Sequence, residues 1–415
     1  MQGALCWERQ SLSNGLIALV FPRTSAMTTQ LAVTLKYGSN SDSEEKSGAA
    51  HLLEHMIAGG SPERIQLSRD IERLGGSADF FTTHDYTMII ADVLPEKSCE
   101  TAKILSKLLF DSRFAKENFE KEQKIVLHEI AEAKDNPWIK IDEMLTQCLY
   151  HNHPVRHPVS GYTKTIRNLT LKDIEQTHCA QYVTGNLILA VTGQFNAAQK
   201  ESIFRTFAEA KQSDKAAVSN RVDIAENNHP KSGMTKKKAG LSQAYLSVGA
   251  RTVSGKHTDI PALELINIIM GGGASSRLFI EMREKSALAY NILSSQECGV
   301  DYGYFHIDCA VKTKNLTKAT HLLLGELQKI CSEKVSDAEL SKAKDMILGA
   351  IYREIDSSVN LPETLTSMEM LFSSERALTD YINKLEGITA RDIAETAGKY
   401  FQENNYSIVA LTPKS

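Results

Sequence analysis

Apolar and polar positions along the chain repeat one pattern twice. A strand-like run at Asp85–Val93 is followed by a helical pattern over Cys99–Phe110. A similar run at Asp301–Cys309 is followed by a helical pattern over Leu316–Cys331. A short apolar run is typical of a strand, and a hydrophobic period near 3.6 predicts a helix. The chain is therefore predicted to contain two copies of one strand-and-helix unit.

A polar segment, residues 211–240, separates the two copies and contains Pro230, Gly233 and a run of three lysines. Such a composition is typical of an interdomain linker. We therefore expect one domain at residues 1–210 and a second, homologous domain at residues 241–415. Strands followed by long helices, with few tight hairpin turns, favour the α+β class, in which each domain is a mostly antiparallel sheet packed with helices.

A helix is predicted around His51, Glu54 and His55, with Ser47 as a reasonable N-cap and Gly59-Gly60 as its end. Positions four apart share one helix face, so both imidazoles can point at one metal ion, with the acid beside them. A catalytic zinc keeps three protein ligands, so this pair needs a third. The alternative is an ordinary amphipathic helix with two unrelated histidines.

A second helix is predicted over Phe119–Ile130, where apolar residues at helical spacing alternate with acids. Glu122 and Glu129 are seven residues apart, about two turns, and so share a face. One acid on this helix is the natural third ligand, and the other can orient a histidine or the attacking water. Without the histidine pair, a solvated acidic face would be the simpler interpretation.

Together these residues resemble the signature of the M16, or pitrilysin-type, metallopeptidases, which include the mitochondrial processing peptidase. That family carries an inverted H-x-x-E-H zinc motif, followed by a glutamate in an E-x-x-x-x-x-x-E pattern. The resemblance implies that His51, His55 and Glu129 bind one zinc ion per chain. It also implies that Glu54 is the general base and that Glu122 is a supporting acid in the catalytic site.

The resemblance extends to residues 75–87, which are similar to the family's G-G-x-x-N-A-x-T segment, an edge strand beside the zinc. Ala78, Asp79 and Phe80 are accordingly expected to bind the substrate. Asp79 and Phe80 stand where the family usually has Asn and Ala. An Asn amide can donate a hydrogen bond to a substrate carbonyl, whereas an ionised Asp cannot.

In the second half, residues 271–279 and 283–290 match the family's second-domain signature. There the resemblance implies that Arg283 and Tyr290 hold the substrate backbone. Half-length members of the family pair, so a homodimer, or a heterodimer with a related M16 chain, is expected. The resemblance also implies the fold of the mitochondrial processing peptidase type.

Composition narrows the classes of function. The chain has 415 residues, a net charge of −4 and a pI near 6.3, so electrostatics favour neither nucleic acid nor membrane as a partner. No apolar run approaches the roughly 20 residues that span a bilayer. Residues 1–10 lack the apolar region of a signal peptide, so a cytoplasmic location is expected.

Three histidines crowd the segment Tyr150–Pro158, which also holds two prolines. The prolines predict an irregular, exposed loop, with a second metal site as the alternative interpretation.

The function expected from all these features is that of a zinc-dependent endopeptidase acting on unfolded peptides or presequences. The alternative is a non-catalytic subunit that binds peptides or supports assembly in a two-chain M16 complex.

Overall fold

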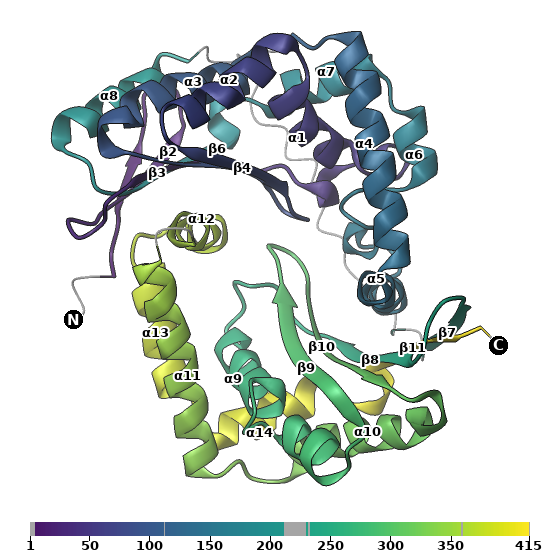
Figure 1. Cartoon of the computed structure of the whole chain (residues 1–415). Coiled ribbons are helices and arrows are strands. Elements are labelled where there is room, and N and C mark those ends of the chain that lie inside the picture. Colours follow the sequence, from purple (N-terminus) through teal and green to yellow (C-terminus); the bar gives the residue numbers. More distant parts are fainter. Residues whose placement is uncertain (1–4, 112, 211–229, 231–232, 358–359, 415) are drawn as a thin grey trace. The chain divides into compact units, whose positions relative to one another are not determined.

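The computed structural model describes residues 5–111, 113–210, 230, 233–357 and 360–414. These residues form two compact units, each a mostly antiparallel sheet with helices packed against it (Figure 1). The predicted α+β class with two similar domains is therefore confirmed. Throughout the described part of the chain, each helix is too short or too polar to traverse a lipid bilayer.

The first unit is built on a six-stranded sheet, called sheet A, with the strand order β1-β2-β6-β3-β5-β4. β2 and β6 are parallel, and the other neighbouring strands are antiparallel. β4 ends this order, so one of its edges has no partner strand among the described residues. The strands are β1 (Glu8–Ser11), β2 (Ile17–Pro22), β3 (Thr29–Leu35), β4 (Ser77–Thr82), β5 (Thr87–Val93) and β6 (Leu187–Gly193).

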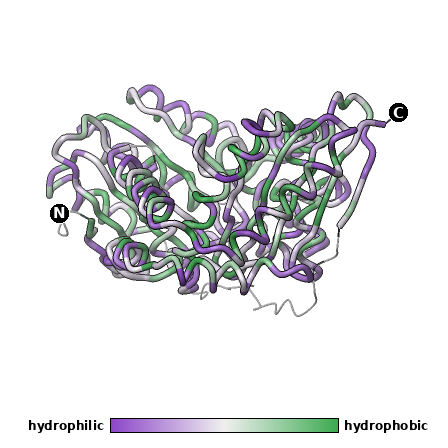
Figure 2. Tube along the Cα trace, turned by 90° about the horizontal axis from the view of Figure 1, so that it is seen from below, coloured by the Kyte–Doolittle hydropathy of each residue, from purple (hydrophilic) through white to green (hydrophobic). Residues whose placement is uncertain are grey.

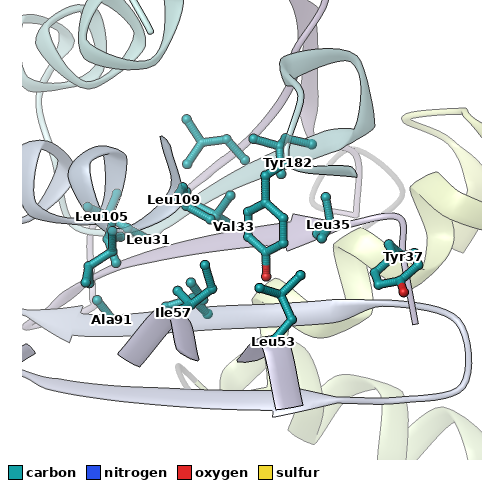
Figure 3. Close-up of a cluster of buried hydrophobic side chains, with 14 of the residues drawn as sticks. Leu31, Val33, Leu35, Tyr37, Leu53, Ile57, Ala91, Leu105, Leu109 and Tyr182 are labelled. Carbon is teal, nitrogen blue, oxygen red and sulfur yellow. The ribbon is translucent and has the colours of Figure 1, made fainter. Parts of the chain in front are cut away.

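Helices on one face of sheet A bury its core. Leu53 and Ile57 of α1 are fully buried near Val33 of β3 (Figure 3). Burial of each such side chain contributes about 1.5–3 kcal/mol. His51 and His55 precede them by two positions, about 200° around the helix, and so emerge on its opposite side. These helices are α1 (Ala49–Gly59), α2 (Pro62–Arg73), α3 (Ser98–Phe110), α4 (Lys116–Asp135), α6 (Thr163–Asn168), α7 (Leu171–Gln181) and α8 (Ala197–Ala208).

The second unit repeats this topology. Its five-stranded sheet B has the order β7-β11-β8-β10-β9, which parallels β2-β6-β3-β5-β4 of sheet A and again begins with a parallel pair. Hydrophilic and hydrophobic stretches alternate along the chain in both units (Figure 2). The strands are β7 (Gly233–Lys238), β8 (Ala244–Arg251), β9 (Ala289–Cys298), β10 (Gly303–Val311) and β11 (Tyr406–Pro413). The helices are α9 (Ile260–Gly271), α10 (Leu316–Ser332), α11 (Asp337–Asp356), α13 (Ala377–Gly387) and α14 (Ala390–Tyr400).

Each unit contains one helix encoded in the other half of the chain. α5 (Pro137–Leu149) packs on β8 and β11 of sheet B, and α12 (Leu361–Phe372) packs on β3 and β6 of sheet A. The preceding helices α4 and α11 have 20 residues each, about 30 Å, and carry the chain beyond their own sheets. The units are therefore not the contiguous stretches 1–210 and 241–415.

Most of the segment assigned to a linker, residues 211–229 and 231–232, lies outside the described residues. Its end, Gly233–Lys238, forms β7 at the edge of sheet B, in parallel with β11. The lysines there are largely exposed, as on many edge strands, where charge discourages further pairing.

Polar contacts, in addition to buried Leu361 and Leu365, hold the helix α12 to sheet A. The guanidinium of Arg9 in β1 donates two hydrogen bonds, of 2.8 and 2.9 Å, to the carboxylate of Glu369. Glu369 is only 3% exposed, so this ion pair is shielded from water on one side. The hydroxyl of Tyr86 donates a 2.7 Å hydrogen bond to Glu363 at the start of the same helix.

Arg9→Met is expected to lower the free energy of unfolding of the first unit by about 2–4 kcal/mol, because Glu369 would stay buried without its counter-charge. The two tryptophans report the units separately, since Trp7 lies in the first unit and Trp138 in α5 of the second. Urea unfolding followed by fluorescence should show the loss in a Trp138→Phe background and a much smaller change in a Trp7→Phe background.

Glu8→Gln is the matched control for this experiment. This variant removes the ion pair between Glu8 and Lys200, in which Oε1 and Nζ are 3.0 Å apart and both side chains are open to solvent. The free energy of unfolding should fall by less than about 1 kcal/mol. Equal losses for the two variants would contradict a dominant role for the buried pair.

Candidate metal centre

Two helices bring three potential metal ligands together. Nε2 of His51 lies 3.6 Å from Oε2 of Glu129, and Nε2 of His55 lies 3.5 Å from the same oxygen. The three ligand atoms lie within 4.8 Å of one another and, in the part of the chain that the structure describes, form the one such group of three side chains. The structure therefore joins the side chains that the sequence nominates as ligands, with two on α1 and one on α4.

The hydrogen bonding of His55 fits a bound cation. Its Nδ1 lies 3.4 Å from Oε2 of Glu122, a carboxylate that is 6% exposed. Donation of the Nδ1 proton to that carboxylate leaves a lone pair on Nε2, directed at the carboxylate of Glu129. The lone pair and the carboxylate repel each other unless a metal ion or a proton lies between them. Two imidazole nitrogens and one carboxylate oxygen are a donor set that zinc prefers.

Electrostatics shift the pKa values of the two histidines in opposite directions. Burial lowers the pKa of His51 to about 4, and the charge of His55 adds to that shift, so His51 is neutral at pH 7. Burial also lowers the pKa of His55, but the hydrogen bond with Glu122 and the charges of Glu54 and Glu129 outweigh it and raise the pKa. A metal at this position would therefore compete with a proton on His55.

Glu54 is held beside the three ligands by the edge strand. Its Oε2 lies 4.0 Å from Nε2 of His51 and accepts a 3.2 Å hydrogen bond from the hydroxyl of Thr82 in β4. Burial raises the pKa of Glu54, and the charge of His55 and the Thr82 hydrogen bond oppose this shift. Thr82 was missed as a site residue by sequence reasoning. Thr82 lies two residues after Phe80 and four after Ala78 in β4, so all three side chains lie on the same, helix-facing side of the strand. This spacing is the signal that could have identified Thr82.

The supporting acid Glu122 lies against Gly59 of α1, the helix that carries His51 and His55 and is called the metal helix below. A Cβ added at Gly59 would lie 2.6 Å from Oε1 and 3.0 Å from Cδ of Glu122. A side chain at position 59 would therefore push the Glu122 carboxylate away from its present place beside His55. The spacing along the sequence could not reveal the contact between Gly59 and Glu122, because these residues lie on different helices.

The start of α1 differs from the prediction. The N-cap position is Gly48, with φ of 94°, and not Ser47, and no side chain of the cap residue bonds to the helix. Asp42 takes that role instead, accepting hydrogen bonds from the backbone N–H groups of Gly48 at 2.9 Å and Ala50 at 3.2 Å. An added Cβ at position 48 would lie 2.7 Å from the carbonyl oxygen of Ser160, so the close approach of that loop requires glycine here.

The predicted peptide-binding residues lie on β4. Ala78 and Phe80 pack partly against the core, whereas Asp79 is exposed and alternates onto the other face of the strand. All three pair with β5 on one side only, so the backbone of the other edge has no partner strand among the described residues.

The second unit brings Arg283 and Tyr290 together. The guanidinium carbon of Arg283 lies 4.4 Å from the ring centre of Tyr290 and 4.8 Å from that of Phe279. Arg283 lies in the π-helical turn Phe279–Lys285, and Tyr290 lies near the start of the edge strand β9. The Tyr290 side chain is 75% exposed, so the stacked pair presents a cation and a ring to solvent.

The histidine-rich segment is not an exposed loop throughout. His153 is 3% exposed, its Nδ1 accepts a hydrogen bond from the backbone of Val155, and its Nε2 lies 3.3 Å from Asp301. Proline at the first position starts a short 3₁₀ turn, Pro154–Arg156, that lies within the second unit. This histidine has a structural role.

With this geometry established, the chain can be compared with known proteins. Residues 19–162 match the insulinase family, peptidase family M16, and residues 168–347 match the peptidase M16 inactive domain. The chain belongs to the M16 peptidase family.

Relatives of the same length carry related names. The chain is 24% identical over 408 residues to an uncharacterized zinc protease of Bacillus subtilis, with 98% of each chain covered. It is 28% identical over 402 residues to an uncharacterized zinc protease of Rickettsia felis, with 96% of each covered. The crystal structure of a protease from Helicobacter pylori superposes with a TM-score of 0.90 at 24% identity, covering 98% of this chain and 99% of that one. At that identity the likeness shows a shared fold.

Gly59→Ala is expected to weaken zinc binding by about tenfold, because the new methyl group displaces Glu122 from Nδ1 of His55. Competition with a chromophoric chelator measures the affinity. Gly325→Ala in α10 is the matched control, because a Cβ there meets no atom within 4 Å. That control should keep the wild-type affinity and gain about 0.5–1 kcal/mol of helix stability. Wild-type zinc affinity in both variants would show that Glu122 does not support the centre.

Proposed function

We propose that this chain is a zinc-dependent endopeptidase, in which His51, His55 and Glu129 hold one zinc ion. The observation that carries the proposal is the convergence of these three donors within 4.8 Å, with Glu122 bonded behind one imidazole. Zinc, when bound, would supply Lewis-acid chemistry toward a peptide carbonyl and a water molecule. The names of the zinc protease relatives support the choice of metal.

The residues around the three ligands would supply the proton transfers. Glu54 is the proposed general base, since its carboxylate lies beside the ligands without being one of them. It would accept a proton from water and later deliver that proton to the leaving amine. Burial brings the pKa of Glu54 closer to neutrality, where a group that must both accept and donate a proton works best. Thr82 would hold the carboxylate in place through the whole cycle.

An unfolded peptide or presequence would bind as an added strand along β4. The backbone of that edge offers unpaired N–H and C=O groups beside Ala78, Asp79 and Phe80, so binding would depend mainly on the peptide backbone. Arg283 and Tyr290 would contact the substrate backbone from the second unit. A homodimer, or a heterodimer with a related M16 chain, stays a prediction from the resemblance.

Metal analysis and peptidase assays on four variants test the assignment. His51→Ala and Glu129→Ala should lose the zinc, which is expected at about one ion per chain in the wild type. Glu54→Gln should keep the zinc but cleave a fluorogenic peptide about 10²- to 10⁴-fold more slowly, the usual contribution of a general base. Glu132→Ala, at an exposed position one turn further along α4, is the matched control and should keep both.

Two outcomes would overturn parts of this proposal. Full activity of Glu54→Gln would exclude Glu54 as the base. A wild-type protein that binds zinc but cleaves no member of a diverse peptide mixture would instead support the non-catalytic, peptide-binding subunit.

Asp79→Asn is expected to lower KM for peptides a few-fold, about 1 kcal/mol, because an amide can donate to a substrate carbonyl where an ionised carboxylate cannot. Ser77→Asn places the same amide two residues earlier on the same exposed face and should leave KM unchanged. An unchanged KM for Asp79→Asn would mean that this side chain does not touch the substrate.

A further inference from the structure

Side chains from outside the helix hold both ends of α1, the helix that carries His51 and His55. Asp42 binds the N–H groups of the first turn, and Arg64 binds a carbonyl of the last turn. A helix carries partial positive charge at its N-terminus and partial negative charge at its C-terminus. A hydrogen-bond acceptor at the first turn and a cationic donor at the last turn both match this dipole.

Asp42 uses both of its oxygens. Oδ2 accepts from the N–H of Gly48 at 2.9 Å, and Oδ1 accepts from the N–H of Ala50 at 3.2 Å and from the hydroxyl of Tyr37 at 2.6 Å. The first residues of α1, Ala49 and Ala50, offer no polar side chain of their own, and Gly48 makes no side-chain cap. Asp42 therefore supplies the side-chain cap for this helix, and its contact at Ala50 lies one residue before His51.

The segment that carries Asp42 also contacts the turn between β4 and β5. The backbone N–H of Ser39 donates to the carbonyl of Thr83 at 3.1 Å, and that of Asn40 donates to the carbonyl of His84 at 2.9 Å. A Cβ at Gly38 would lie 2.5 Å from the backbone nitrogen of Tyr86, so this contact is too close for any side chain. One short segment thus positions the metal helix relative to the edge strand.

At the other end, Arg64 is 2% exposed and has no carboxylate within ion-pair distance among the described residues. Its Nη1 donates to the carbonyls of Ile57, two residues after His55, and Leu108 at the end of α3. Its guanidinium also lies 4.6 Å from the ring centre of Phe114. Burial lowers the pKa of Arg64 to about 10, so it remains charged at neutral pH.

We propose that Asp42 is a positioning residue for the metal centre, holding the N-terminal turn of α1 so that His51 meets Glu129 of α4. Arg64 is its counterpart at the end of the helix. This inference rests on the proposed zinc site, because its consequence is the geometry of the ligands. A helix of 11 residues without its own cap can shift or fray at its first turn, and His51 lies in that turn.

The experiment compares Asp42→Asn with the wild type in zinc affinity, in the visible absorption of the cobalt-substituted protein, and in thermal midpoint. An amide keeps the shape but turns an N–H donor toward the helix N–H groups. Zinc affinity should fall about tenfold, the lower range for residues that orient metal ligands. The cobalt spectrum should change in intensity, because it reports ligand geometry.

Asp392→Asn is the matched control. Asp392 is also a carboxylate that bonds the start of a helix, through Thr389 at the N-cap of α14, but it lies in the second unit. It should lower the thermal midpoint and leave zinc affinity and the cobalt spectrum unchanged. A general loss of stability moves only the thermal midpoint, so the two metal readouts separate positioning from stability.

His51→Ala separates the two possible failures. If it binds zinc as tightly as the wild type, the proposed metal site is itself wrong. If it loses zinc while Asp42→Asn keeps the wild-type affinity and spectrum, only the positioning role is overturned. Should Asp42→Asn fail to fold, Tyr37→Phe decides the question: removing one hydrogen bond to Asp42 should weaken zinc binding about threefold, and wild-type affinity would refute the proposal.

Discussion

Three electron-pair donors on two helices converge to within 4.8 Å, and the rest of the first unit is arranged around that approach. Two neutral imidazoles and a carboxylate repel one another unless a metal ion or a proton lies among them, and the packing holds them close together. Leu53 and Ile57, both buried, bind α1 to the sheet, while glycine at position 59 lets Glu122 come close. Burial of the apolar side of α1 thus stabilises the position of the helix that brings the polar groups on its other side together.

The second unit has the same fold but, among the described residues, no such group of three metal-binding side chains. Its sheet repeats the strand order of the first, and α9 packs beside the edge strand β9 as α1 packs beside β4. Leu263 and Ile266 of α9 are apolar and fully buried. Buried polar groups lower stability unless they are paired, so an apolar helix is the simpler solution where no metal is held.

The sequence predicted features that depend on local periodicity and failed where distant segments meet. Helical spacing was enough to place His51 and His55 on one face, and strand-like runs were enough to recognise the repeated sheets. The exchange of α5 and α12 could not be foreseen, because an apolar helix face does not specify which sheet it will cover. The cap from Asp42 likewise depends on an irregular backbone segment, for which hydrophobic periodicity carries no information.

The edge strand β4 links the two proposed tasks of the site. Its unpaired edge would receive the peptide backbone, and its last residue, Thr82, donates a hydrogen bond to Glu54 at 3.2 Å. Thr82 also lies 3.3 Å from the hydroxyl of Thr87, which in turn donates to the carbonyl of Tyr37, next to the segment that bonds the metal helix. A strand that shifted to accept a peptide would therefore move the proposed base with it. Asp42 connects the same region to α1. The proposed peptide edge, the proposed base and the proposed ligands are therefore linked by direct contacts, as would be needed to bring a bound carbonyl to a metal in a reproducible orientation.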